Sequence, residues 1–141
     1  MQLISEDLST DLSSRRTSMS FQRTRLAADR TLMAVIRTSI SLMSFGFTIH
    51  QLAESLKERG LLASDGTERS FGGALIVIAI AVLAMGIIYH LRFMLQMRRE
   101  RKAMVAAGLL HADDQFPPSM TVITALLLLT LGIVTIIAIA T

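Results

Sequence analysis

Apolar residues in this chain come in three long blocks that polar segments separate. The blocks run from Thr31 to Ala53, from Ser70 to Leu91 and from Gln115 to Thr141, and the last two carry no charge if His90 is neutral. A helix needs roughly 20 apolar residues to cross the hydrocarbon core of a bilayer, which is about 30 Å thick. The pattern therefore predicts an all-α protein with three spans, over about residues 31–53, 71–95 and 119–140.

The first block differs from the other two because it contains Arg37 and several hydroxyl residues. A mid-helix arginine costs about 3 kcal/mol on insertion scales, and less near the end of a span. The apolar positions of this block fit no soluble helix with a single wet face. A buried core helix is the alternative for each block. A soluble domain of 141 residues would then have to bury two helices that are apolar on every side, which favours the membrane.

The segments outside the blocks are polar and basic. Residues 1–19 are rich in serine, and we expect a disordered cytoplasmic N-terminus there. Ser20 is a suitable N-cap for a helix that begins at Phe21 and continues into the first span. Residues 20–141 then form a single transmembrane domain, in which a basic helical extension of the second span continues to about Ala107. No apolar stretch typical of a cleaved signal peptide precedes the first span.

Charge gives the expected orientation. Only 18% of the residues are charged, and the formal net charge is +3. Basic residues gather before the first span and between the second and third spans, where the positive-inside rule places the cytoplasm. The N-terminus is therefore predicted inside, and the C-terminus outside. No basic stripe alternates with stacking aromatic residues, so we expect no nucleic-acid partner.

Several kinds of chemistry lack the residues they need. The chain has no cysteine, which excludes disulfides, thiolate catalysis and cysteine-ligated metals. His50 and His90 would lie at opposite sides of the membrane and could not share a metal ion. No phosphate-binding loop, nucleophile elbow or catalytic carboxylate pair is present. We therefore expect no enzyme activity, no cofactor and no metal site.

The first helix contains three Arg-Thr pairs at a spacing of seven, which begin at Arg23, Arg30 and Arg37. Seven residues are nearly two helical turns and drift by only about 20°, so the arginines share one stripe. At about 100° per residue the same stripe continues outward through hydroxyl and amide side chains. We call this stripe the polar seam; its residues are Arg23, Arg30, Arg37, Ser41, Ser44, Thr48 and Gln51.

The polar seam has two interpretations. Exposure of the seam to lipid would be energetically costly, so the seam must face water or other helices. Several copies around an axis would stack rings of arginine above rings of hydroxyls, and arginine rings favour anions. The alternative is structural, because hydroxyl residues in membrane helices commonly mediate helix packing, and cytoplasmic arginines hold topology or bind anionic lipid. Thr38, which follows Arg37, belongs to the same candidate anion-binding set.

Two further features suggest roles in assembly. Asp29 is the one acidic residue in the basic stretch of the first helix, four residues after Arg25. It forms either a local helix pair or a brace for an arginine of a neighbouring chain. Gly72, Ala79 and Gly86 repeat every seven residues in the second span, and small residues at this spacing are typical of a close-packing face.

The stretch from Phe21 to Phe47 resembles the small bacterial inner-membrane proteins of the YidH type, the family catalogued as domain of unknown function 202. The resemblance lies in Asp29-Arg30-Thr31, Arg37-Thr38-Ser39 and Phe45-Gly46, and in the three-span layout. Asp29 stands where glutamate is commoner in the family. The resemblance implies a multi-pass protein of the bacterial inner (cytoplasmic) membrane.

This family is also similar to the membrane domain of the eukaryotic vacuolar transporter chaperone, which translocates polyphosphate. The resemblance thus implies a homo-oligomer such as a pentamer, with the first span lining the axis and with phosphate or polyphosphate as the permeant. The leading hypothesis is an anion channel. The alternative is an accessory or scaffold subunit that binds partner proteins and anionic lipid.

Overall fold

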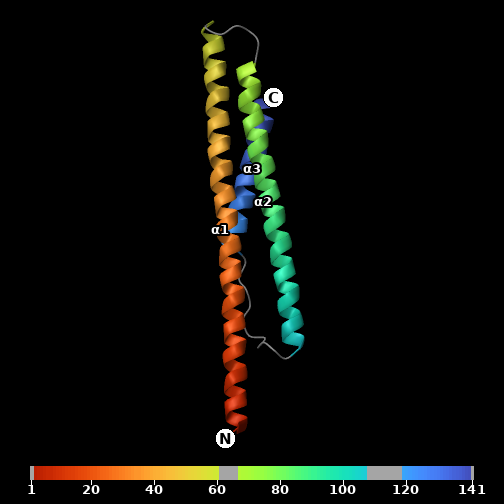
Figure 1. Ribbon diagram of the computed structural model, residues 1–141. Helices are drawn as coiled ribbons and strands as arrows, with labels where there is room; N and C mark the ends of the chain where they lie inside the picture. Colours follow the sequence, from red (N-terminus) through yellow and green to blue (C-terminus); the bar gives the residue numbers. More distant parts are fainter. Residues whose placement is uncertain (1, 61–66, 108–118, 141) are drawn as a thin grey trace. The chain divides into compact units, whose positions relative to one another are not determined.

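The computed structural model describes residues 2–60, 67–107 and 119–140, whose regular structure is all helical. Helix α1 covers Gln2–Glu58, α2 covers Thr67–Ala106 and α3 covers Met120–Ala140 (Figure 1). Each helix contains a stretch long and apolar enough to cross a membrane. The prediction of an all-α chain with three potential membrane-spanning helices is confirmed.

Helices α1 and α2 are longer than a bilayer requires. Their 57 and 40 residues correspond to roughly 85 Å and 60 Å of helix, against about 30 Å of hydrocarbon. The basic segment after the second apolar block is helical to Ala106, which agrees with the predicted extension. Gly60 terminates α1 at its C-terminal end. It has a positive φ of 69° and donates its backbone N–H to the Lys57 carbonyl at 3.0 Å.

The beginning of α1 differs from the prediction. The helix starts at Gln2, so the expected start at Phe21 is wrong, and Gln2–Met19 are helical where disorder was expected. Serine and threonine lower helix propensity because their hydroxyls compete for backbone groups. Here the Thr17 hydroxyl donates to the Ser13 carbonyl one turn back, at 3.0 Å, so this hydroxyl is satisfied within the helix. An ion pair between Asp11 and Arg15, at 3.2 Å, adds to this local support.

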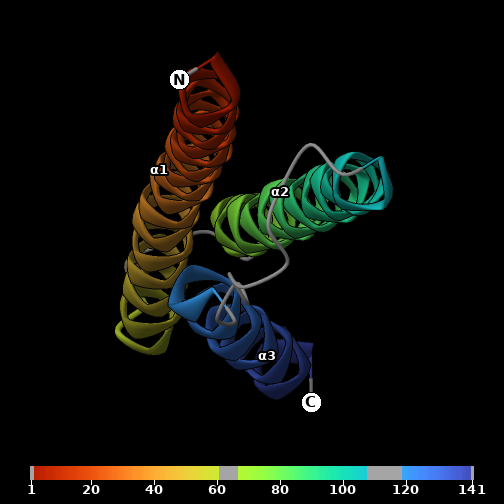
Figure 2. The ribbon, with the colours of Figure 1, turned by 90° about the horizontal axis from the view of Figure 1, so that it is seen from below.

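The chain divides into two compact units, to which α1 and α2 both contribute. The first unit takes its described residues from 1–31 and 89–119, and the second from 32–88 and 120–141. In the second unit, segments of all three helices lie side by side (Figure 2). Its core is built from buried apolar side chains of each helix: Leu32, Ile36, Leu83, Ile87 and Ala125.

Glycines let α1 and α2 approach closely within the second unit. A Cβ atom added to Gly46 would lie 2.7 Å from the Gly72 carbonyl oxygen, and one added to Gly72 would lie 2.7 Å from the Gly46 carbonyl oxygen. Gly86 lies against the side chain of Val35, and Ala79 is fully buried. Gly72 and Gly86 of the predicted close-packing face therefore face α1 of their own chain.

Candidate functional site

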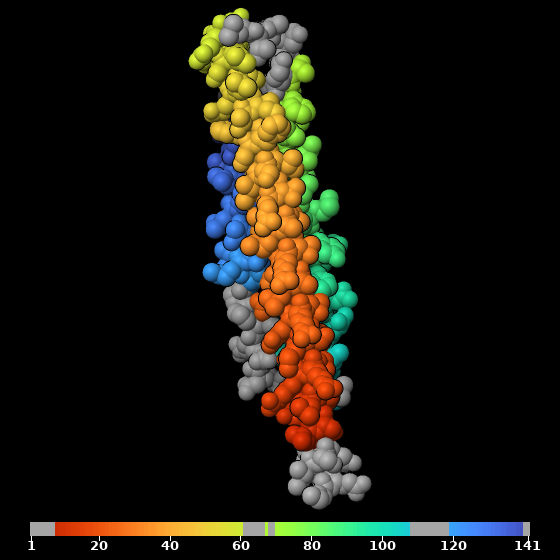
Figure 3. Space-filling model, turned by 60° about the vertical axis from the view of Figure 1, so that its left-hand side comes forward, coloured from red at the N-terminus to blue at the C-terminus, as the bar shows by residue number. Residues whose placement is uncertain are grey.

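The polar seam lies on the face of α1 that the chain's own packing leaves bare. All seven predicted anion-binding residues are exposed: Arg23 and Arg30 in the first unit, and Arg37, Thr38, Ser41, Ser44 and Thr48 in the second. The buried residues of α1 in the second unit lie roughly 100° to 180° around the helix from Arg37; among them are Ile36, Ser39, Gly46, His50 and Ala53. For the second unit, Figure 3 shows one face of α1 with α3 on one side of it and α2 on the other.

The three arginines of the seam, Arg23, Arg30 and Arg37, have no acidic side chain paired with them in the described part of the chain. A guanidinium group presents five donors in a planar fork, which matches the oxygens of phosphate and carboxylate groups. The seam can therefore attract and bind anions, and nothing in the described chain neutralises it.

The hydroxyls of the seam bond within their own helix. Thr38 donates to the Ala34 carbonyl at 3.0 Å, Ser41 to the Arg37 carbonyl at 3.0 Å, and Thr48 to the Ser44 carbonyl at 2.8 Å. Such bonds to the preceding turn satisfy a hydroxyl without water or a second helix. The hydroxyl part of the seam is therefore less costly to remove from water than the arginine part.

The structure adds a fourth Arg-Thr pair to the three found in the sequence. Because α1 extends back to Gln2, Arg16 and Thr17 lie within it, seven residues before Arg23 and Thr24. Arg16 is exposed, and the Thr17 hydroxyl makes the same bond to the preceding turn as Thr24 and Thr31. The spacing of seven, taken one step further back, would have found this pair.

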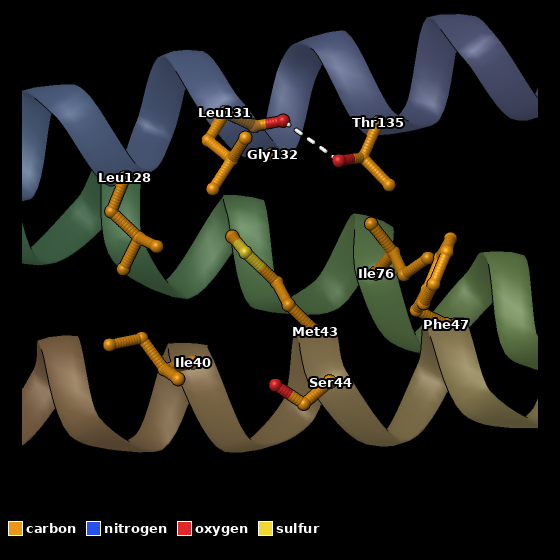
Figure 4. Close-up of a pocket in the computed structure, with 9 residues that line it drawn as sticks. All are labelled: Ile40, Met43, Ser44, Phe47, Ile76, Leu128, Leu131, Gly132 and Thr135. Atoms are coloured by element: carbon orange, nitrogen blue, oxygen red, sulfur yellow. Dashed lines mark hydrogen bonds between the residues drawn. The ribbon is translucent and has the colours of Figure 1, made fainter.

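A groove runs beside the seam in the second unit. It encloses about 280 Å³ between α1 and α3, with Ile76 of α2 also contributing to its wall (Figure 4). Its lining is apolar except for the hydroxyls of Ser44 and Thr135, and the latter donates to the Leu131 carbonyl at 2.9 Å. Ser44 therefore belongs both to the seam and to the edge of the groove.

Asp29 points into its own chain. Its Oδ1 atom accepts a hydrogen bond from the Ser119 hydroxyl at 2.8 Å and lies 3.4 Å from Nε2 of His90. The His90 side chain is 3% exposed, and this contact lacks the geometry of a hydrogen bond. All three residues belong to the first unit, where they connect α1, α2 and the residue before α3. Sequence reasoning missed His90 and Ser119 as partners; a role for Asp29 in assembly stays a prediction.

Two polar side chains on the packed face of α1 are buried, Ser39 and His50, and their burial was not predicted from the sequence. Oγ of Ser39 and Nδ1 of His50 have no hydrogen-bond partner among the described residues. They lie eleven residues apart, or roughly 16 Å along the helix, so they do not form one site. No group of three histidine or acidic residues within the described residues is arranged to hold a metal ion.

Residues 23–96 match the family described as a domain of unknown function (DUF202). The match covers more than half of the chain, and it includes the seam and the close contact between Gly46 and Gly72. No curated protein and no solved structure matches the chain. The protein is therefore a member of the DUF202 family, as the Arg-Thr motifs suggested, with three helices able to cross a membrane.

Proposed function

We propose that this protein assembles as a homo-oligomer, such as a pentamer, and forms an anion pathway lined by the polar seam of α1. The observation that carries the proposal is the exposure of the seam on the face of α1 opposite its packed residues. Within a bilayer this face would meet hydrocarbon unless water or another chain covers it. Several copies arranged around an axis would supply neighbouring chains on the sides of this face and water at its centre.

The two parts of the seam have different roles in this proposal. Arg23, Arg30 and Arg37 attract anions and select them, since they are exposed and lack ion-pair partners among the described residues. Ser41, Ser44 and Thr48 line the narrower part of the path. The forked donors of arginine suit phosphate oxygens, so the proposed permeant is phosphate or a polyphosphate-like chain.

The proposed orientation follows from the basic residues. The N-terminus and the segment between α2 and α3 face the cytoplasm, and the C-terminus faces outward. The membrane would be the bacterial inner membrane. On its cytoplasmic face, basic residues that follow the second span are placed to meet anionic lipid headgroups: Arg92, Arg98, Arg99, Arg101 and Lys102.

A second candidate function is a non-conducting scaffold or accessory subunit. The bonds of Thr38, Ser41 and Thr48 to their own helix favour it, because hydroxyls satisfied in this way do not require a water-filled path. In that case the seam packs against a partner protein, and the arginines bind headgroups.

Reconstitution separates the two candidates. The purified protein is placed in liposomes, and the flux of chloride and of phosphate is compared with that of potassium. The channel predicts anion flux whose preference over potassium is lost in Arg37→Ala and reduced in Arg30→Ala. Arg98→Ala, an exposed arginine of α2 outside the seam, is the matched control and should keep the preference. A stable oligomer without flux would favour the scaffold.

A further inference from the structure

The arginines of the seam lie on the middle one of three parallel stripes that repeat every seven residues along α1, and Ser41 and Thr48 of the seam lie on a neighbouring stripe. The central stripe consists of Arg16, Arg23, Arg30, Arg37, Ser44 and Gln51. About 40° to one side lies a stripe of large apolar residues, the large flank: Leu12, Met19, Leu26, Met33, Ile40 and Phe47. About 60° to the other side lies a stripe of small residues, the small flank: Ser13, Ser20, Ala27, Ala34, Ser41 and Thr48.

All three stripes are exposed in both units. The side chains of the large flank are between 42% and 58% exposed, and each member of the small flank and the central stripe is also exposed. In the second unit α3 lies beside the large flank, where Ile40 and Phe47 line the groove, and in the first unit α2 lies beside Ser20 of the small flank. A row of six large apolar residues thus follows the helix and stays at least 42% exposed within the described chain.

The period identifies the kind of partner. A seven-residue apolar repeat drifts by about 20° per repeat on a straight helix, so it faces one partner throughout only when two helices wind around each other. Knobs of one helix then enter holes of the next. Lipid chains impose no such period. The partner that fits the large flank is therefore another helix, with holes at the same seven-residue spacing.

The small flank of a second copy of α1 supplies those holes. Rotation about an axis along the membrane normal leaves every residue at its own depth, so Ile40 of one copy must meet residues of similar depth in the next. Ile40 and Ser41 differ by only about 1.5 Å in rise. The same holds for Met33 and Ala34, one repeat earlier. Large residues therefore meet small ones at each level, while the copies remain parallel.

We infer that the large flank of α1 in one copy packs on the small flank of α1 in the next, parallel copy. The arginine stripe, which lies between the two flanks of each helix, then faces the axis. This interface rests on the proposed homo-oligomer and names its contact surface. It uses two different patches of one helix, so it closes into a ring when the rotation permits. Arg16 then adds a fourth ring of arginines at the end of the path nearest the N-terminus.

The groove beside α3 enlarges the same surface. Ile40 and Phe47 of the large flank form its α1 side, and Leu131 lies across from them on α3 (Figure 4). A neighbouring α1 that packs on the large flank would cover the groove as well. The small side chains of that neighbouring helix would leave room for the α1 and α3 side chains that line the groove. Ser44 of the central stripe then faces the path, whereas Ser41 and Thr48 of the small flank lie at the contact with the next copy, at the edge of the path.

Disulfide trapping in membranes tests the inference, since the natural chain has no cysteine. The double variant Ile40→Cys/Ser41→Cys should give a ladder of cross-linked species that ends at one largest oligomer. Each single variant should lose the ladder, because this contact needs both flanks. Adjacent residues have Cα atoms 3.8 Å apart, below the usual range of about 4.4–6.8 Å for disulfides, so pairing within one chain is disfavoured. Met33→Cys/Ala34→Cys should repeat the result one step along the helix.

Val77→Cys/Ile78→Cys is the matched control: an adjacent pair on α2 whose natural side chains are 52% and 51% exposed. It should give no ladder. An equal ladder from this pair, or dimers from Ile40→Cys alone, would overturn the inference. If neither α1 pair gave cross-links in a folded, membrane-embedded protein, the large flank would not contact the small flank of another copy, and the inference would be overturned.

The same experiment separates this interface from the proposed function. A ladder without anion flux would support the interface and contradict the channel, whereas flux without a ladder would support the channel and contradict this interface.

Discussion

The two faces of α1 follow the same seven-residue period but differ in charge and in how closely another helix approaches. On the packed face Ser39, Gly46 and Ala53 repeat every seven residues, and at Gly46 the backbones of α1 and α2 approach until a methyl group no longer fits. On the exposed face the same period carries arginine beside large apolar side chains. The comparison teaches that neither hydroxyl content nor residue size marks the outside of this helix, because serine occurs on both faces and the large side chains of Leu32 and Ile36 are buried. Charge distinguishes the two faces, since the arginines of the seam are all exposed.

The largest effect on stability is expected where two backbones meet. Gly46→Ala places a Cβ 2.7 Å from the Gly72 carbonyl oxygen, so α1 and α2 must separate, at a cost of about 3 kcal/mol. Gly73→Ala is the control: the same substitution in a helix, with no atom within 4 Å of the new Cβ. It should stabilise the protein slightly, because alanine is the better helix former. Equal unfolding curves in a detergent-denaturant titration would contradict the close contact.

The next effect concerns the inward carboxylate of Asp29. Asp29→Ala removes the acceptor of the Ser119 hydrogen bond and leaves the buried His90 without its neighbour, which should cost about 2 kcal/mol. Asp29→Asn keeps an acceptor oxygen and should cost less. Arg30→Ala, the next residue and an exposed one, should leave the free energy of unfolding nearly unchanged. If Arg30→Ala destabilised the protein more than Asp29→Ala, the division of α1 into packed and exposed faces would fail in the first unit.

A smaller effect is expected where a side chain rather than a backbone lies opposite a glycine. In Gly86→Ala the new Cβ lies 2.7 Å from Cγ1 of Val35, and in Gly132→Ala it lies 2.8 Å from Cε of Met43. Valine is stiff at χ1 and methionine is flexible. Gly86→Ala should therefore destabilise by about 1 kcal/mol, and Gly132→Ala by less. The order Gly46, Gly86, Gly132 in thermal unfolding checks the argument, and the reverse order would refute it.

The smallest effect on stability belongs to the exposed hydroxyls. Ser41→Ala and Thr38→Val remove hydroxyls that bond only to carbonyls of their own helix, so the free energy of unfolding should change by less than about 0.5 kcal/mol. Thr130→Val on α3, whose hydroxyl also bonds within its helix, is the control. Under the proposed function, anion flux should fall in Ser41→Ala and not in Thr130→Val. A large loss of stability in Ser41→Ala would mean that this face is packed.

The sequence predicts the three helices well because each apolar block is long enough to cross a membrane. Two of the blocks have no charge, which makes a buried core helix of a soluble domain the less fitting alternative. It also identifies the seam, since a polar stripe is visible at helical spacing. The packed face was harder to find: Ser39 and His50 are polar yet buried, and only the backbone approach at Gly46 shows why. The partners of Asp29 could not be predicted, because Ser119 lies ninety residues away along the chain. The early start of α1 could not be predicted, because serine favours caps and turns over helix interiors.

The hydroxyl bonds of α1 determine how its oxygens are oriented toward a passing ion. A carbonyl has no proton to donate, so Thr38, Ser41 and Thr48 must direct their protons at the backbone and their lone pairs away from it. In this orientation the row presents acceptors, which repel an anion. An anion would have to rotate each hydroxyl outward and break a bond of about 1 kcal/mol. Under the proposed function, the sign of the permeating ion would therefore depend on the arginines, and the hydroxyl row would adjust to the ion by rotation about single bonds.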